Sequence, residues 1–290
     1  MIQLRKLFTP VESMDPEEAR EYLASHPEGS YTLLDVRQPW EYEEEHLPGA
    51  TLIPLPQLTD QYRELDPDKP TLVHCAIGGR SRVAAQLLAG LGFKELYNLA
   101  GGIKAFQGRK AAGPLELNLD LIRGDESPTE VVILAYGMEK AMQTFHETVA
   151  ARTDAPDLAA LCRQLAHYEE LHEEKLAALY RNLEPTAPDL PAVMAERQPA
   201  LMEGGFQPQK FLQQNAAFMK SLPEMLELAL MLETQALDLY LRFAGRLTQP
   251  QAREVLYTLA QEEKAHLARL AALWDEKRLA GGGAGESSKQ

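Results

Sequence analysis

The sequence predicts a multidomain protein in which an α/β domain precedes an all-α four-helix bundle. Short β-rich runs alternate with helical patches up to about residue 108, which is typical of a mainly parallel sheet covered by helices. Beyond residue 128 the strand pattern disappears and long helical segments follow. The chain has 290 residues, which is long for one hydrophobic core and suits two.

We expect four regions along the chain. The α/β domain occupies residues 1–108, and a segment with Gly, Pro and turn residues at both ends forms a linker over 109–127. The bundle occupies residues 128–276. Residues 277–290 are rich in Gly and Ser, so we expect a disordered tail there.

Composition excludes several classes of protein. The net charge of −14 argues against nucleic-acid or anionic-membrane partners, because both need a basic surface. The two cysteines, Cys75 and Cys162, are too few for a disulfide scaffold or a four-cysteine metal site. No run of signal-peptide type or of ~20 apolar residues occurs. We therefore expect a cytoplasmic protein without membrane or nucleic-acid partners.

The elements of the first domain follow from local pattern. Runs rich in Val, Leu, Ile and Tyr predict four strands, and the segments between them predict helices. The predicted strands are 31–36, 50–55, 71–76 and 95–100, and the predicted helices are 17–26, 56–65 and 81–92.

Cys75 lies at the end of a predicted buried strand, before a Gly-containing turn and a helix. Loop amides and a helix N-terminus lower the pKa of a thiol and make its thiolate nucleophilic. Arg80 adds a fixed cation that can neutralise a thiolate, a persulfide or an anionic donor. A buried structural thiol is the alternative for Cys75, and packing is our interpretation of Cys162.

The pattern Cys75-x-x-Gly78-x-Arg80 resembles the active loop of a rhodanese, and the stretches 33–50 and 97–108 support the resemblance. It implies that Cys75 accepts a sulfane sulfur as a persulfide and passes it to a thiol acceptor or cyanide. The resemblance also implies that loop amides surround the sulfur and that arginines support the loop or an anionic donor. The implied substrate-binding residues are Ala76, Ile77, Gly78, Gly79, Ser81 and Arg37, and Arg80 is implied as a catalytic residue.

A related phosphatase fold also uses a cysteine followed by arginine. That fold needs one more residue between them to surround phosphate, and only four residues separate Cys75 from Arg80. Sulfur chemistry is therefore favoured over phosphate chemistry.

The second domain contains four long predicted helices, at 128–152, 156–182, 222–246 and 249–275. A proline-bearing connection, 183–221, joins the second to the third and contains a short helix near 208–221. A shift of 94 residues overlays the second pair of helices on the first, so the bundle is interpreted as a duplicated hairpin. The shift pairs Glu139 with Glu233, Glu169 with Glu263, and His172 with His266.

Helix geometry brings these six residues together. Residues three apart share a helix face, so each Glu-x-x-His pair points one way, and the earlier glutamates lie at the same height in the hairpins. Facing hairpins then place four carboxylates and two imidazoles in one buried layer. Four buried carboxylates without cations would be prohibitively costly, so the layer predicts bound metal.

The two Glu…Glu-x-x-His sets resemble those of rubrerythrins in the ferritin-like superfamily. The resemblance implies two metal ions, with Glu139 and Glu233 as terminal ligands, Glu169 and Glu263 as bridging ligands, and the histidines as terminal nitrogens. We expect iron, while the ligand types also suit manganese or zinc. His146 and Tyr240 lie two turns beyond proposed ligands, where we expect supporting roles.

The departures from rubrerythrins concern electron supply and ligand number. The chain lacks the four cysteines of a rubredoxin-like domain, so the electron donor would be external. Ala236 stands where rubrerythrins carry an additional glutamate. The expected function is a sulfurtransferase fused to a di-iron bundle that reduces peroxide or oxygen. One alternative is a non-catalytic sulfur carrier or metal-binding redox sensor. Another is a bundle that serves as a dimerisation module, and a homodimer is compatible with either.

Overall fold

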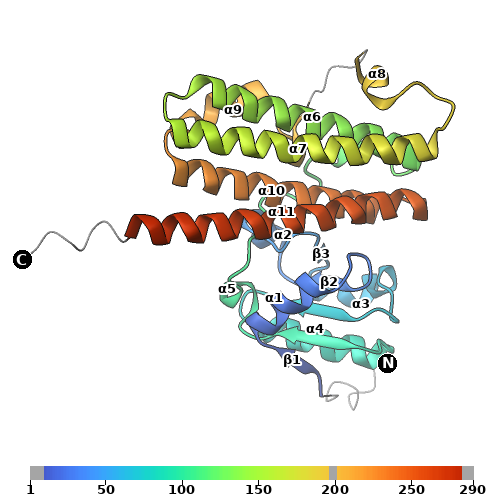
Figure 1. Cartoon of the computed structure of the whole chain (residues 1–290). Helices are drawn as coiled ribbons and strands as arrows, with labels where there is room; N and C mark the ends of the chain where they lie inside the picture. The colour runs from blue at the N-terminus through green and yellow to red at the C-terminus, as the bar shows by residue number, and fades with distance from the viewer. Residues whose placement is uncertain (1–9, 196–200, 283–290) are drawn as a thin grey trace, which may run out of the picture. The chain divides into compact units, whose positions relative to one another are not determined.

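The computed structural model describes residues 10–195 and 201–282. The chain divides into two compact units, Met1–Asp120 and Leu121–Gln290. Figure 1 shows the strands gathered in the first unit and the long helices in the second. The α/β domain followed by an all-α region, as predicted, is confirmed.

A parallel five-stranded sheet forms the centre of the first unit, with strand order β1-β5-β4-β2-β3. The four predicted strands are present in shortened form. β1 was not predicted, because its three residues, Glu-Ser-Met, contain no apolar run. The strands are β1 (Glu12–Met14), β2 (Thr32–Asp35), β3 (Thr51–Leu52), β4 (Thr71–His74) and β5 (Leu96–Leu99).

Helices surround this sheet. Asp15 starts the first of them by accepting hydrogen bonds from the amides of Glu17 and Glu18, while the Glu18 carboxylate accepts one from the Asp15 amide. The helices of this unit are α1 (Pro16–Ser25), α2 (Pro39–Glu44), α3 (Leu58–Gln61), α4 (Gly79–Leu91) and α5 (Gly102–Ala105).

The helix predicted at 56–65 is wrong as one continuous element. The segment contains a 3-10 turn (Leu55–Gln57), the single turn of α3, and a second 3-10 turn (Tyr62–Glu64). Tight i to i+3 hydrogen bonds at both ends replace the α-helical ladder there, as short connecting segments often do.

The side chains of the sheet alternate between two apolar layers, as strand geometry requires. Leu34 and Val73 pack with Leu88 of α4, whereas Leu33 and Leu72 pack on the opposite layer with residues of α1 and α2. Every residue of β4 is buried, as is typical of a parallel strand covered on both faces. Cys75 therefore follows the most protected strand of the unit.

The predicted linker at 109–127 is shorter in the structure. Ala111 exchanges two backbone hydrogen bonds with His46, and the Gly113 amide donates to the Glu43 carbonyl, so this part belongs to the first unit. Gly124 accepts hydrogen bonds from the backbone and side chain of Thr248, which ties the later part to the second unit. The turn-rich composition predicted a boundary between the two units, but it could not predict these backbone hydrogen bonds.

Four long helices, which run side by side in Figure 1, form the second unit. Ser127 begins the first by capping the Glu130 amide, and Ser221 caps the third in the same way. Their bounds are α6 (Pro128–Arg152), α7 (Pro156–Leu183), α10 (Leu222–Arg246) and α11 (Pro250–Gly282). The connection between α7 and α10 carries α8 (Leu190–Ala195), η5 (Glu203–Gly205), α9 (Pro208–Asn215) and η6 (Ala216–Phe218).

Helix α11 continues to Gly282, six residues beyond the predicted end of the bundle. The remainder of the predicted tail, 283–290, lies outside the described residues. Cys162 is fully buried in the bundle core beside Phe145 and Leu165, which agrees with a packing role.

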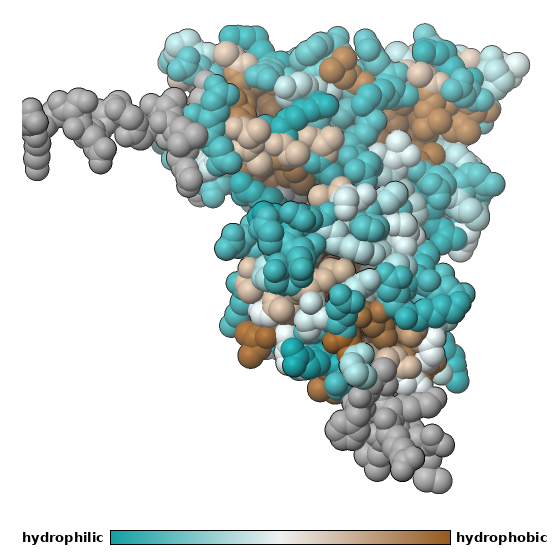
Figure 2. Space-filling model, turned by 60° about the horizontal axis from the view of Figure 1, so that its bottom comes forward, coloured by the Kyte–Doolittle hydropathy of each residue, from teal (hydrophilic) through white to brown (hydrophobic). Residues whose placement is uncertain are grey.

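On the face drawn in Figure 2, hydrophilic residues cover most of the surface and hydrophobic residues form separate small areas. Within the described ranges, we find no helix long and apolar enough to cross a membrane.

Candidate functional site

The first candidate site surrounds Cys75, which is 1% exposed. Directly after β4 the chain turns at Gly78, whose φ of +91° favours glycine, and α4 starts at the next residue. The Gly78 amide donates a hydrogen bond to Cys75 Sγ at 3.1 Å, and Ser81 Oγ lies 3.4 Å from the same sulfur. The loop thus aims hydrogen-bond donors at one thiol.

These donors set the acidity of Cys75. Burial raises the pKa of the thiol, but hydrogen bonds from the Ser81 hydroxyl and from the amides of Ser81, Ile77 and Gly78 outweigh burial and lower it. Ala76 and Gly79, which the sequence also assigned to the cradle, belong to the same loop. The arrangement favours a thiolate, the nucleophilic form of cysteine.

The backbone of α5 forms hydrogen bonds with the backbone of the Cys75 loop. The Ile103 amide donates to the Cys75 carbonyl at 2.9 Å, and the Lys104 amide donates to the Ala76 carbonyl at 3.2 Å. Gly102 makes this approach with a φ of +61°, and a Cβ at this position would lie 2.3 Å from the Cys75 carbonyl oxygen. Only glycine fits there.

Both arginines named from the sequence are bound to carboxylates. Arg80 donates through two nitrogens to Glu41, each at 2.6 Å, and this pair together with a Gln38 amide hydrogen bond brings the pKa of Glu41 to about 2 although burial opposes the shift. Arg37 is buried and donates to Asp35 and to the Glu45 carbonyl. Arg80 therefore connects the start of α4 with α2, and Arg37 connects the end of β2 with Glu45.

Asn98 is a polar residue near the site that sequence reasoning missed. It is 1% exposed on β5, and its Oδ1 accepts a hydrogen bond from Ser81 Oγ at 2.6 Å. Because a hydroxyl carries one proton, Asn98 competes with the Cys75 sulfur for the proton of Ser81. A polar residue within an otherwise apolar strand, LYNLA, was the available signal.

The second candidate site is a layer of acidic and histidine side chains inside the bundle. The structure brings together all six residues paired by the 94-residue repeat, and each is at most 4% exposed. The His172 Nδ1 atom lies 3.2 Å from Glu139 Oε2, and the His266 Nδ1 atom lies 3.6 Å from Glu233 Oε2. The two imidazole rings stack with centroids 4.3 Å apart. The Nδ1 atoms thus face the carboxylates.

The carboxylates of this layer lack ordinary partners. Among the described residues, neither oxygen of Glu169 or Glu263 has a hydrogen-bond partner, and one oxygen each of Glu139 and Glu233 also has none. Burial and the neighbouring carboxylates raise the pKa of Glu139, Glu169 and Glu263 well above the ordinary value. Burial also opposes ionisation of Glu233, but His266 outweighs it and brings this pKa to about 2.

This donor set fits metal ions. Buried carboxylate oxygens without hydrogen-bond partners are costly, and cations supply the missing partners. Several triads of these side chains place one ligand atom each within 4.8 Å of the others, including Glu233, Glu263 and His266. Carboxylate and imidazole groups at such distances could hold metal ions.

Glu203 also belongs to this layer, although the sequence did not assign it. It is 0% exposed, and it forms a further triad with Glu139 and Glu169 within the same 4.8 Å limit. Its Oε1 accepts a hydrogen bond from Tyr240 at 2.7 Å. Glu203 lies in the connection 183–221, which has no helical repeat, so no spacing rule could identify it.

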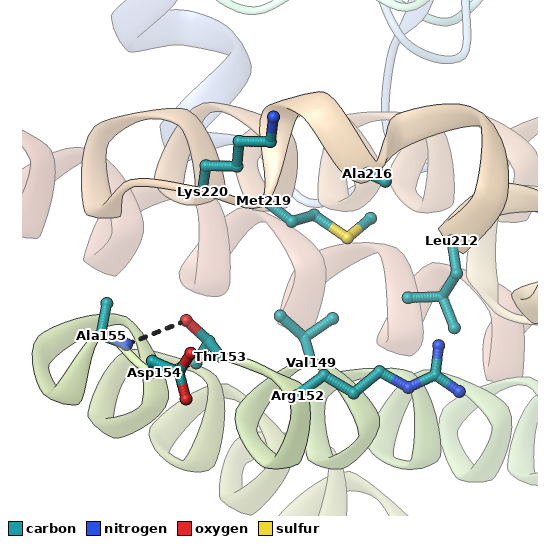
Figure 3. Close-up of a pocket in the computed structure, with 9 residues that line it drawn as sticks. All are labelled: Val149, Arg152, Thr153, Asp154, Ala155, Leu212, Ala216, Met219 and Lys220. Atoms are coloured by element: carbon teal, nitrogen blue, oxygen red, sulfur yellow. Dashed lines mark hydrogen bonds between the residues drawn. The ribbon is translucent and has the colours of Figure 1, made fainter.

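Two pockets lie on the bundle. One, of about 500 Å³, is lined by both His172 and His266 and by the cationic Lys175 and Arg269. The other, drawn in Figure 3, has a volume of about 510 Å³ and lies between the end of α6 and the α9–η6 segment. The first pocket reaches the outer side of the carboxylate layer, whereas none of the predicted ligands lines the second. His146 is buried with Nε2 3.7 Å from Glu169 Oε1, beyond hydrogen-bond distance.

Comparisons with known proteins match both units. A family model described as a rhodanese-like domain matches residues 15–109, and one described as rubrerythrin matches residues 209–281. The second match contains Glu233, Glu263 and His266 but not the first hairpin or Glu203.

Named relatives match the first unit. "Thiosulfate sulfurtransferase GlpE" of Pseudomonas syringae is 34% identical over 100 residues, covering 34% of this chain and 91% of the relative. "Uncharacterized protein YqhL" of Bacillus subtilis is 46% identical over 77 residues, covering 27% of this chain. The chain spans 61% of the length of the Bacillus protein. A crystal structure of a rhodanese-like domain protein from Staphylococcus aureus aligns with 24% identity and a TM-score of 0.32, covering 34% of this chain and 94% of the other.

The first unit is thus a rhodanese-like domain, and part of the second matches the rubrerythrin family model. The chain belongs to the rhodanese family.

Proposed function

We propose that the first unit is a sulfurtransferase that carries sulfur as a persulfide on Cys75. The observation that carries the proposal is the thiol at the end of β4, whose pKa is lowered by the amides and hydroxyl aimed at it despite its burial. Membership of a family with a named thiosulfate sulfurtransferase supports the substrate class. Arg80 ties the start of α4 to Glu41 of α2, and Arg37 pairs with Asp35 at the end of β2.

The proposed reaction has two balanced steps. The Cys75 thiolate attacks the outer sulfur of thiosulfate, a Cys75–sulfur bond forms, the sulfur–sulfur bond of the donor breaks, and sulfite leaves with the bonding pair. A thiolate or cyanide then attacks the outer sulfur of the persulfide, and the Cys75 thiolate leaves. The amides of Ile77, Gly78 and Ser81 would stabilise the negative charge in both steps.

Persulfide formation can be tested directly by mass spectrometry of the intact chain. Incubation with thiosulfate should add 32 Da, about the mass of one sulfur, and cyanide should remove it with release of thiocyanate. Cys75→Ser should show neither change. Addition of sulfur to the Cys75→Ser protein would contradict the assignment.

We propose that the bundle is a two-metal oxidoreductase centre that reduces a small oxidant such as peroxide. The carboxylate layer with unpaired oxygens carries this proposal, and the rubrerythrin match supports iron. Glu139 and His172 would hold one ion, Glu233 and His266 would hold the other, and both ions would share Glu169 and Glu263. Bound iron would supply electrons to the oxidant, and an external donor would restore them.

The chain's own residues would control access to this centre. The pocket lined by His172, His266 and two cationic side chains offers a short path for a small molecule. Elemental analysis of anaerobically purified protein should give about two iron ions per chain, and peroxide should change the optical spectrum. Protein that lacks metal and has no affinity for iron would rule out this proposal.

A further inference from the structure

We propose that Glu203 is an additional metal ligand, supplied by the connection between the two hairpins, that makes the two metal positions inequivalent. The inference rests on the proposed metal site. Neither the 94-residue repeat nor the rubrerythrin match at 209–281 includes this residue. Three independent features of the structure support it.

The first feature is the position of the Glu203 carboxylate. It is 0% exposed, and it approaches Glu139 and Glu169 closely enough for all three to share one ion. Its Oε2 has no hydrogen-bond partner among the described residues. Carboxylates that approach each other in a dry interior need a proton or a cation between them.

The second feature is how the other oxygen is held. Tyr240 donates a hydrogen bond of 2.7 Å to Glu203 Oε1 and is itself fully buried on α10. One oxygen is therefore fixed by a donor, and Oε2 stays available to an ion. Supporting hydrogen bonds of this kind orient metal-binding carboxylates.

The third feature is the turn that presents Glu203. The Met202 amide donates to the Phe206 carbonyl at 2.8 Å, and the Gly205 amide donates back to the Met202 carbonyl at 3.0 Å. Gly204 has a φ of +72°, and a Cβ there would lie 3.0 Å from the Gln235 Cβ on α10. The turn is thus packed against the helix that carries Glu233 and Tyr240.

Glu203 has no counterpart in the duplicated hairpins. A shift of 94 residues toward the N-terminus leads to Arg109, in the first unit, and the opposite shift passes the last residue. Four carboxylates balance the charge of two divalent ions, and Glu203 adds a fifth, whose close ligand triad is with Glu139 and Glu169. In a medium of low dielectric, the ion nearest this extra charge should bind more tightly.

The test uses metal-free full-length protein and Co²⁺ as the probe, in calorimetric titrations. Wild type should bind two ions with different affinities. Glu203→Gln, which keeps an acceptor for Tyr240, should weaken the tighter site at least about tenfold and bring the two affinities together. Glu227→Gln is the control, because it removes the same charge from an exposed position on α10.

Thermal unfolding gives a second readout. Glu203→Gln should reduce the rise in melting temperature that Co²⁺ causes, because the tighter site loses a ligand. Glu227→Gln should leave that rise unchanged. If Glu203→Gln does not fold, Glu203→Asp serves instead, since the shorter side chain withdraws the carboxylate and should weaken the same site.

The outcomes separate the two proposals. Two ions bound by Glu203→Gln with the affinities of wild type would overturn the role of Glu203 and leave the metal site intact. Wild-type protein that binds no Co²⁺ would overturn the metal site itself.

Discussion

The two candidate sites differ in how their buried polar groups are satisfied. Around Cys75, amides and a hydroxyl face the sulfur, and both arginines have carboxylate partners. In the bundle the acidic oxygens outnumber the donors, and several have no partner among the described residues. The comparison indicates that the first site is complete as protein alone, whereas the second needs cations to be complete.

The largest effect should come from removal of the thiol. Cys75→Ala should reduce sulfur transfer from thiosulfate to cyanide by at least about 10³-fold, because the covalent step is lost. Steady-state release of thiocyanate measures this. Cys162→Ala is the matched control: burial raises the pKa of Cys162 to about 11, so that thiol should not react, and transfer should persist. Equal loss in both variants would point to general damage to the protein.

Loss of an imidazole should empty part of the second site. His172→Ala and His266→Ala should each reduce bound iron from about two ions per chain toward one, because each Nδ1 faces a different pair of carboxylates. Elemental analysis measures the ratio. His167→Ala provides the control, since that side chain is 61% exposed on the same helix as His172. Unchanged iron content in the first two variants would argue against these ligands.

The close approach behind the Cys75 loop should be sensitive to a single methyl group. Gly102→Ala should lower the free energy of unfolding of the first unit by about 1–3 kcal/mol, because both the backbone angle and the contact with the Cys75 carbonyl forbid a Cβ. Chemical denaturation followed by Trp40 fluorescence reports on this unit. Gly79→Ala should change stability far less, because a methyl group at that position would have no atom within 4 Å.

The smallest effect concerns the acidity of Cys75. Hydrogen bonds to the thiolate lower its pKa, so removing a donor in Ser81→Ala should raise the pKa of Cys75. The rate of alkylation by iodoacetamide rises with pH as the thiolate forms, and its midpoint should therefore move to higher pH in the variant. A midpoint at or below that of wild type would show that Ser81 does not stabilise the thiolate.

The sequence predicted the long-range features that depend on regular geometry. A helix is rigid enough for a 94-residue offset and i, i+3 spacing to place six candidate ligands in one layer before any coordinates are known. The Cys75 loop was predictable for a similar reason, because a strand end, a glycine turn and a helix start have fixed relations. The four bundle helices and the packing role of Cys162 could also be predicted from helical periodicity.

The rest depended on tertiary contacts that no local pattern records. Glu203 lies in an irregular connection, and only the packing of its turn against α10 brings it to the other carboxylates. Arg80 and Glu41 are 39 residues apart, so their pairing could not be read from spacing. The polar strand β1 forms because β5 offers it an edge, not because of its own composition.

The depth of Cys75 has a consequence for the order of events at the first site. The residue is 1% exposed, yet Ile77, two positions further along the loop, is 69% exposed. In a persulfide the second sulfur would lie about 2 Å beyond Sγ. An acceptor would then reach the outer sulfur of the persulfide before it reaches Cys75 Sγ. Burial would shield the Cys75 thiol from oxidation, while the outer sulfur would be accessible for transfer.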